Sequence, residues 1–282
     1  MHNLAFSRNF ADVRKVLFKR KGSQWFSFYS RIPSGLFSGD VRVRNCIYLL
    51  SPSGEQLLTS RLHRWFTEQR DNLFTSEIQY VAFKNNGCIP MLHSDNIQNI
   101  YENTNGIHIS QLLTQDGKPL FCKKVGYNFL SISEIQPPAY NECNVMIEQT
   151  GLDCINIEKK YYEEILLLMC GKFYLSKWLT YGDDFHVTSR DIISFSFPFE
   201  SISKSDSQIL HNCYINMVNR IPETIQFKLN AGINVGTYNT SQLWDITDIS
   251  DMIFFKYITD SPVKLKEKIE SHICKCVISG KV

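Results

Sequence analysis

The strongest constraint on the fold is a long apolar helical pattern in residues 163–199, which runs into a polar turn and then a short apolar segment. Apolar side chains recur at helical spacing along its first half and require a core to pack against: Ile165, Leu166, Leu168, Met169, Phe173, Leu175 and Trp178. Residues 181–188 form the polar turn, and the apolar run behind it ends at Pro198. We expect a buried helix, a polar turn and a short strand, with a few polar groups at the rim of a packed module.

The composition is that of an ordinary globular chain. Its 282 residues are 43% hydrophobic and 21% charged, which is enough material for one large or two modest domains. The formal net charge of +2 excludes a polyelectrolyte, but the charge is unevenly spread. Residues 8–21 contain six lysines and arginines and one aspartate, a pattern that favours a phosphate partner and equally describes a solvated helix face.

Cysteine usage and the absence of long apolar runs bear on the compartment. The nine cysteines have no framework spacing, which indicates reduced thiols and a cytoplasmic setting. Cys274 and Cys276, with His272 nearby, lack the second ligand pair of a zinc site, so no metal is expected. No apolar run approaches ~18 residues and no N-terminal signal is visible, so we expect a soluble protein with no membrane partner.

Apolar spacing and turn residues predict the order of the elements. A short helix with Phe10, Val13, Val16 and Leu17 on its inner face ends near Gly22. Strands are expected over residues 25–29 and 43–50, the second buried on both faces. Helices are expected over residues 95–105 and 206–221, and a helical tail over residues 248–276. Residues 1–51 alone therefore make up only the last quarter of an α/β domain.

Three segments carry a resemblance to a known family. They are SRIPSGLFSGDVRVRNCIYL at residues 30–49, WLTYGDDFHVTSRDIISFSFPF at residues 178–199, and residues 234–248, which contain NVGTYNT and LWDITD. In this order they resemble the C-terminal part of restriction–modification adenine-specific (N6) DNA methyltransferases of the type I and IIG kind. The resemblance implies an α+β fold: a partial edge of the methyltransferase sheet in residues 1–51, a mixed α/β target-recognition module in residues 52–247, and a helical tail in residues 248–282.

The motifs that such an enzyme needs for catalysis are missing. No glycine-bearing turn follows a strand in the N-terminal part, where the family binds S-adenosylmethionine. The family's Asn/Asp/Ser-Pro-Pro-Tyr/Phe tetrapeptide, which holds a flipped adenine, is also absent. The nearest string, residues 136–139 (QPPA), has neither the short polar first residue nor the aromatic last one. We therefore expect no cofactor in this chain and no methylation by it alone.

The resemblance implies the DNA-recognition portion of a site-specific adenine DNA methyltransferase, present either as a separate chain or as an inactive fragment. Duplex DNA is the expected partner. Residues 25–50 would lack the neighbouring strands of a complete sheet, so apolar side chains including Phe26, Phe28 and Leu49 are expected to lack part of their burial. These residues are therefore expected to bind a catalytic methyltransferase partner or a second copy. The alternative is a non-catalytic protein-interaction module that uses the same scaffold and binds no DNA.

Candidate DNA contacts are cations for phosphates and planar polar or hydroxyl groups for base edges. Phe37 is placed near the flipped base by the resemblance, and its other interpretation is a core side chain beneath the hairpin. His186 is also interpreted as a structural histidine, and the polar loops as ordinary turns. The complete candidate set is Arg14, Lys15, Arg31, Phe37, Tyr181, His186, Thr188, Ser189, Arg190, Lys228, Asn234, Tyr238 and Asn239.

Overall fold

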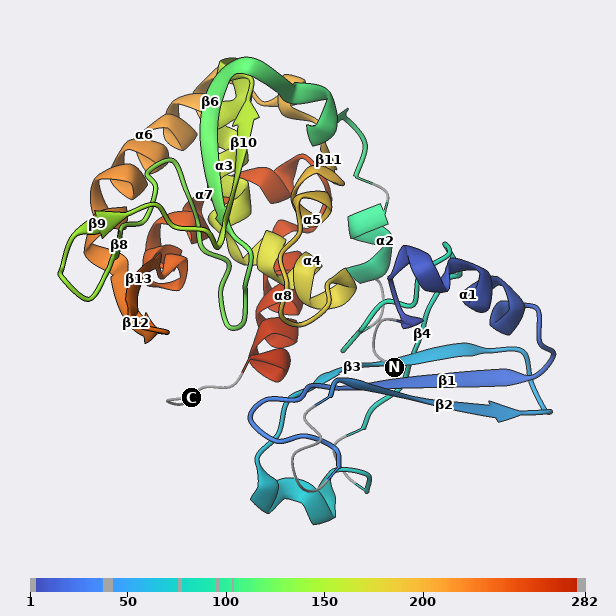
Figure 1. The fold of residues 1–282 in the computed structure, drawn as a ribbon. Coiled ribbons are helices and arrows are strands. Elements are labelled where there is room, and N and C mark those ends of the chain that lie inside the picture. Colours follow the sequence, from blue (N-terminus) through green and yellow to red (C-terminus); the bar gives the residue numbers. More distant parts are fainter. Residues whose placement is uncertain (1–3, 38–42, 76–77, 95–96, 103, 278–282) are drawn as a thin grey trace. The chain divides into compact units, whose positions relative to one another are not determined.

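The computed structural model is an α+β fold built from mixed sheets and helices, and it describes residues 4–37, 43–75, 78–94, 97–102 and 104–277 (Figure 1). The chain forms two compact units. The first unit comprises residues 1–103, 176–184 and 264–282, and the second comprises residues 104–175 and 185–263. Within the described ranges, no helix is long and apolar enough to cross a membrane.

The division into units differs from the sequence-based boundaries at residues 51 and 247. Strand β3 (Leu57–His63) pairs with β1 (Ser23–Tyr29), so the segment just after residue 51 completes the same sheet as the segment before it. The expected tail of residues 248–276 is two helices, α7 (Trp244–Lys256) and α8 (Pro262–Cys276). Most of α8 joins the first unit, whereas α7 belongs to the second.

The first unit is built on a four-stranded sheet in the order β2-β1-β3-β4, with β2 at Asn45–Ser51 and β4 at Val81–Ala82. Figure 1 shows β1 between β2, which is antiparallel to it, and β3, which is parallel to it. This central position explains why Phe26 and Phe28 of β1 are fully buried. They were expected to lack part of their burial, and that expectation is wrong because β3 supplies the second neighbour.

Strand β2 lies where the sequence predicts it, but its predicted burial on both faces is wrong. Leu49 is 54% exposed and Leu50 is 42% exposed. The reason is the strand order, which gives β2 a partner on one side only among the described residues. An edge strand leaves backbone donors and acceptors unpaired and its side chains partly open to solvent.

Helix α1 (Ala11–Phe18), preceded by the 3-10 turn η2 (Arg8–Phe10), buries only part of its expected inner face: Phe10 and Leu17 are half-buried. Val13 is 45% and Val16 is 60% exposed, although both were predicted to lie inward. Phe18 instead packs edge-on against Phe26, with ring centroids 6.5 Å apart. Helix orientation is set here by this long-range aromatic contact rather than by the largest local run of apolar residues.

Further helical segments complete the first unit. They are η3 (Thr67–Asn72), α2 (Ile97–Glu102), the end of α4 (Lys172–Tyr181) and most of α8. The helix expected over residues 95–105 is present from 97 to 102, and residues 95, 96 and 103 lie outside the described residues. The Tyr101 hydroxyl donates to Ser176 Oγ at 2.6 Å, which joins α2 to α4. The inner face of α8 is apolar and buried, and includes Leu265, Ile269 and Ile273.

The strands of the second unit form three small sheets. Strand β6 (Leu113–Lys123) lies between β10 (Leu152–Ile157) and β7 (Ile132–Ser133), and β5 (Ile107–His108) pairs with β11 (Ser196–Phe197). The third sheet has the order β12-β13-β8-β9 and is antiparallel throughout. Its strands are β12 (Ile225–Asn230), β13 (Ile233–Tyr238), β8 (Ala139–Tyr140) and β9 (Met146–Ile147). This last sheet carries the polar segment that the sequence analysis singled out at residues 228–239.

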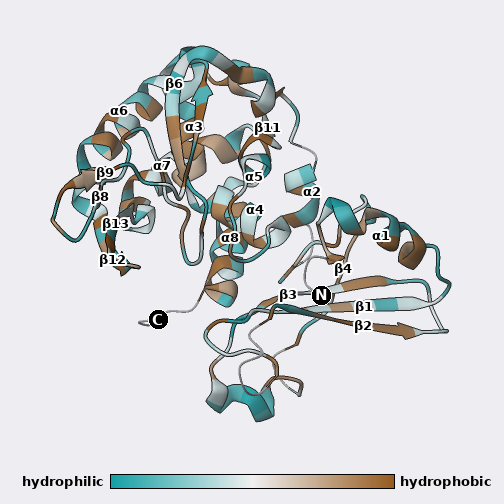
Figure 2. Ribbon diagram, in the orientation of Figure 1, coloured by the Kyte–Doolittle hydropathy of each residue, from teal (hydrophilic) through white to brown (hydrophobic). Residues whose placement is uncertain are grey.

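The core of the second unit is helical. Helix α3 (Tyr162–Cys170) packs against α6 (Lys204–Arg220) and α7, and Figure 2 shows α3 as hydrophobic along much of its length. The remaining helical segments of this unit are short: α5 (Ser189–Ile193), η4 (Ile109–Leu112), η5 (Lys159–Tyr161), η6 (Phe199–Ser201), η7 (Ile221–Thr224) and η8 (Thr240–Leu243). The segment predicted as a short strand after the polar turn begins within α5, and only Ser196 and Phe197 are extended in a sheet.

The single helix expected across residues 163–178 is two helices, α3 and α4, separated at Gly171. Asp251 of α7 causes the break. One of its carboxylate oxygens accepts from the backbone N–H groups of Lys172 and Phe173, at 2.9 and 3.3 Å. These are N–H groups of the first turn of α4, which have no partner within the helix. The carboxylate therefore caps α4 from another helix.

Candidate nucleic-acid interface

The end of strand β6 places two consecutive lysines beside the polar segments predicted to contact DNA. The Lys123 ammonium donates to Thr237 Oγ1 and lies 3.5 Å from the Gly236 carbonyl oxygen, both on β13. Lys228 lies across the same hairpin, opposite Val235. Burial first, and then the neighbouring Lys228 charge, lower the pKa of Lys123. The β6 end therefore brings a second cation to the predicted Lys228 site.

Among the described residues, no carboxylate compensates the charges of Lys123 and Lys228. Within the part of the chain that the structure describes, no aspartate or glutamate forms an ion pair with Lys123 or Lys228. Half-burying an ammonium group beside a like charge costs free energy unless an anion is supplied. The arrangement is thus electrostatically incomplete and suits an anionic ligand such as a phosphate group.

The next residue, Lys124, connects β6 to the other predicted loop. Its ammonium pairs with Asp153 of β10 at 3.1 Å, and Asp153 in turn accepts a hydrogen bond from Ser189 Oγ at 3.2 Å. The backbone N–H of Val187 donates to the Lys124 carbonyl at 2.9 Å. Lys123 and Lys124 therefore tie the polar segment of residues 186–190 and the hairpin of residues 225–238 to one strand end.

The sequence analysis missed both lysines at the end of β6, Lys123 and the next residue, Lys124. The residues that precede them, PLFC at 119–122, are an apolar run, and the paired lysines look like the ordinary polar end of such a strand. A signal was nevertheless present, because two adjacent cations end the strand with no acidic residue beside them. The sequence does not reveal the tertiary contact that places the Lys123 side chain against β13.

Several predicted DNA contacts have structural roles instead. Thr188 caps α5: its hydroxyl accepts from the Asp191 N–H, and the Asp191 carboxylate accepts from the Thr188 N–H at 2.8 Å. Asn239 caps η8 by accepting from the N–H and hydroxyl of Ser241. Tyr238 is buried, with 4% of its surface exposed. Thr188 and Asn239 therefore hold the loops in place through their caps, and the burial of Tyr238 removes it from the surface.

Other members of the predicted set remain on the surface of the second unit. His186 is exposed and its ring contacts Phe185 edge-on, with centroids 5.1 Å apart. Arg190 is exposed on α5, and Lys228 and Asn234 are exposed on the hairpin. Together with Ser189, these residues are the part of the predicted set that the structure keeps next to the β6 lysines or on the hairpin beside them.

Of the predicted DNA contacts in helix α1 of the first unit, Arg14 is buried and Lys15 is exposed. Arg14 is 4% exposed, and its guanidinium donates to the carbonyl oxygens of Leu4, Ser7 and Gly87. Its prediction as a phosphate contact is therefore wrong, because the guanidinium is used inside the fold to satisfy backbone acceptors. Lys15 is exposed and pairs with Asp12 at 2.9 Å, a surface pair of small energetic weight.

Phe37 was interpreted from the sequence either as a side chain near the flipped base or as a core side chain beneath the hairpin. Phe37 is 55% exposed, whereas Leu36 is buried in a cluster with Tyr29, Trp65 and Leu73. The core side chain beneath this segment is therefore Leu36. Arg31 is half-buried in the same loop.

The polar turn around residue 181 is fixed by a hydrogen bond and an ion pair within the first unit. The Tyr181 hydroxyl donates to the Glu102 carboxylate at 2.7 Å, and burial raises the pKa of Tyr181. Asp184 has a positive φ of 72° and accepts from the buried Arg64 guanidinium at 2.6 Å. Tyr181 therefore has a structural partner, and it belongs to a different unit from residues 186–190.

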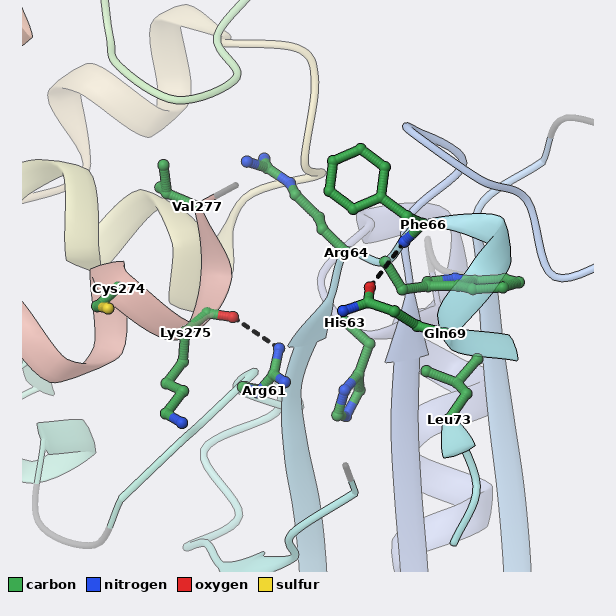
Figure 3. A pocket seen from close by; sticks show the side chains of 10 residues that line it. Arg61, His63, Arg64, Phe66, Gln69, Leu73, Cys274, Lys275 and Val277 are labelled. Atoms are coloured by element: carbon green, nitrogen blue, oxygen red, sulfur yellow. Dashed lines mark hydrogen bonds between the residues drawn. The ribbon is translucent and has the colours of Figure 1, made fainter. Parts of the chain in front are cut away.

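The first unit also contains a cavity of about 250 Å³ between the end of β3, η3 and the end of α8 (Figure 3). Its lining combines cations with aromatic and apolar walls: Arg61, His63, Arg64, Trp65, Phe66, Gln69, Leu73, Cys274, Lys275 and Val277. Arg61 donates to the Lys275 carbonyl at 2.6 Å, and Gln69 accepts from the Phe66 N–H at 2.8 Å, as Figure 3 shows. These hydrogen bonds occupy part of the polar wall, whereas His63 Nδ1 and Trp65 Nε1 are buried without a hydrogen-bond partner among the described residues.

His63 is the buried titratable group of that cavity wall. Its ring stacks on Tyr29 with centroids 5.5 Å apart, and burial together with the Arg61 charge lowers the pKa of His63 to about 3. The imidazole is therefore neutral at physiological pH. Among the described residues no group of three or more histidine, cysteine, aspartate or glutamate side chains is arranged to hold a metal ion.

Comparison with known proteins found no family model, no curated protein and no solved structure that matches this chain. The functional assignment therefore rests on the residues and their geometry.

Proposed function

We propose that this chain is the DNA-recognition portion of a site-specific adenine DNA methyltransferase of the restriction–modification kind. The observation that carries the proposal is a pair of cations without an ion-pair partner among the described residues: Lys123 at the end of β6, and Lys228 on the amide-rich hairpin that the Lys123 side chain contacts. The methyltransferase part of the proposal comes from the three sequence segments that resemble that family.

The charge pattern of the hairpin region favours a polyanion as the ligand. Residues 224–244 contain no aspartate or glutamate, and they include amides at 226, 230, 234, 239 and 242. Amide side chains hydrogen-bond to base edges, and lysines neutralise phosphates and release the counterions of the duplex. The exposed His186 and Arg190 extend the same surface chemistry on the α5 side.

A catalytic partner is part of the proposal because the chain lacks the glycine turn and tetrapeptide of the family. This chain is proposed to bind no S-adenosylmethionine, and the cofactor belongs to the complete enzyme. Strand β2 is the candidate contact, since it is a sheet edge with Leu49 and Leu50 exposed. A strand from a second chain pairs readily with such an edge.

The test compares lysine-to-glutamine variants in duplex DNA binding, followed by fluorescence anisotropy. Lys123→Gln and Lys228→Gln are each expected to lower the affinity and to reduce the slope of log affinity against log salt by about 0.9, the value for one phosphate contact. Lys204→Gln is the matched control, because Lys204 is an exposed lysine of the same unit, at the start of α6. Equal effects of all three variants would contradict the proposal.

A second function, a protein-interaction module without DNA binding, is favoured by the same β2 edge. It predicts self-association or binding of a protein through residues 45–51, with no salt-sensitive affinity for DNA. Replacing Leu49 by lysine places a charge on this edge and should abolish that association, which sedimentation velocity measures. If association is lost in this variant while the wild type never binds DNA, the second function replaces the first.

A further inference from the structure

The hairpin of β12 and β13 stands free of the body of the second unit along its outer strand. Residues 226 to 230 are all exposed, although successive side chains of a strand point to opposite faces. The two strands are joined by a tight turn in which Ala231 and Gly232 both have positive φ, 47° and 80°, as in a two-residue type I′ hairpin. Both faces of the outer strand β12 are therefore available to a ligand.

One face of the ribbon is apolar and open to solvent. Leu229 is 72% exposed and Phe227 is 45% exposed, and both point to the same face because they are two residues apart. The pairing register continues this face across the sheet, from Leu229 through Asn234 and Tyr140 to Met146. The Phe227 and Tyr140 rings are 5.9 Å apart, so Phe227 is supported from behind while Leu229 projects beside the turn.

The other face carries the cation. Lys228 alternates with Phe227 and Leu229 and lies on the side where Lys123 meets β13. The Glu142 carboxylate would repel a phosphate at the turn of the hairpin, because the Glu142 side chain lies against Gly232. The phosphate contacts are therefore expected along the strands, and the tip is left to the uncharged side chains.

Resting on the function proposed above, we propose that this ribbon enters the minor groove of duplex DNA. Lys228 and Lys123 then neutralise phosphates at the rim, and Leu229 wedges between two base pairs with Phe227 behind it. Apolar side chains inserted from the minor groove partly unstack a base step and kink the duplex. Asn234, in the same cross-strand row as Leu229, supplies an amide to the adjacent base edge.

DNA fits this surface better than a protein does. Burying an exposed leucine and phenylalanine removes apolar surface from water, which favours any ligand that covers them. The adjacent cations favour an anionic ligand, because Lys123 and Lys228 have no carboxylate partner among the described residues. The ribbon itself contains no aspartate or glutamate. A duplex presents phosphates and apolar base faces side by side, which matches both faces of the ribbon.

The experiment uses the full chain and a pool of short duplexes of random sequence in which 2-aminopurine replaces part of the adenine. Unstacking of the probe raises its fluorescence. Wild-type protein at saturation is expected to raise the signal, and Leu229→Ser is expected to lose at least half of that rise while anisotropy still reports salt-sensitive binding. Met146→Ser is the matched control, because Met146 is 69% exposed in the same cross-strand row at the opposite edge of the sheet.

The outcomes separate this inference from the proposed function. If wild-type protein shows no salt-sensitive binding, the proposed function fails and the ribbon assignment fails with it. If it binds but Leu229→Ser gives the wild-type fluorescence, or if Met146→Ser loses the same share of the signal, the wedge is overturned while DNA recognition stands. A protein contact on this face predicts the former pattern, with Leu229→Ser and wild type indistinguishable on DNA.

Discussion

At the scale of single residues, the most consequential group is the buried carboxyl of Asp251. It caps α4 with one oxygen, and its other oxygen has no hydrogen-bond partner in the part of the chain that the structure describes. Burial raises the pKa of Asp251 to about 8, so the folded protein favours the neutral acid. The unfolded chain ionises near the ordinary value of ~3.9. The stabilising contribution of this group is therefore full below about pH 4 and is lost as the pH rises toward 8.

Asp251→Asn is expected to flatten this pH dependence. The amide oxygen still accepts from the two N–H groups of α4, but the side chain no longer ionises. The free energy of unfolding of the wild type should fall from about pH 5 to about pH 8, at most by ~1.4 kcal/mol for each pKa unit by which the carboxyl is perturbed. Urea unfolding at the two pH values measures it, with Asp260→Asn, an exposed loop aspartate, as control. An unchanged slope in Asp251→Asn would show that another group controls the stability.

The local chemistry of caps explains which predicted contacts changed role. The sequence places Thr188, Asp191 and Asn239 in polar turns, and the structure confirms the turns. Whether a hydroxyl or amide in such a turn faces a ligand or a backbone N–H depends on where the next helix begins. Thr188 and Asn239 face backbone N–H groups because α5 and η8 begin directly after them. The residue type of a turn side chain does not by itself predict where these helices begin.

At the scale of elements, the division of one predicted helix into α3 and α4 shows how a distant residue overrides a local pattern. Apolar spacing continues across Gly171, so periodicity predicts one helix. Gly171 is extended, with φ −79° and ψ 168°, and it leaves room for the carboxylate of Asp251, 80 positions later in the chain. The sequence predicts the helical residues well here and misses the break because its cause is a tertiary contact.

Gly171→Ala tests this account of the break. A Cβ at this position would collide with the Asp251 carboxylate, whose Cγ would be 2.9 Å away. Overpacking in a buried site of this kind costs about 1–3 kcal/mol, which chemical unfolding measures. In an Asp251→Ala background the obstacle is removed, so the same substitution should cost much less. A cost that is equal in both backgrounds would mean that the carboxylate does not keep residue 171 as glycine.

The burial of strand β2 likewise depends on tertiary contacts that its own sequence does not predict. Its existence was predictable from Cys46, Ile47 and Tyr48, but its edge position was not. The burial of a strand depends on how many neighbours it has, and pairing partners are set by register across the whole sheet. The prediction that residues 25–50 expose apolar surface is accordingly right for Leu49 and wrong for Phe26 and Phe28.

At the scale of the whole molecule, the two units divide the predicted functions. The edge strand β2, the candidate contact for a catalytic partner, belongs to the first unit. The lysines of β6, the α5 segment and the β12–β13 ribbon belong to the second. The sequence resemblance covers both units but does not predict their boundaries, because residues 176–184 and 264–282 complete the first unit from far along the chain.

The central claim is that the second unit binds duplex DNA through Lys123 and Lys228, and the salt dependence of DNA binding tests it most directly. Two phosphate contacts predict that the affinity of the wild-type chain for duplex DNA falls about tenfold when salt rises from ~50 to ~200 mM. In the variant that replaces both lysines by glutamine, the affinity should be lower and nearly independent of salt. Wild-type binding that does not weaken with salt, or a double variant with the wild-type slope, would contradict the account.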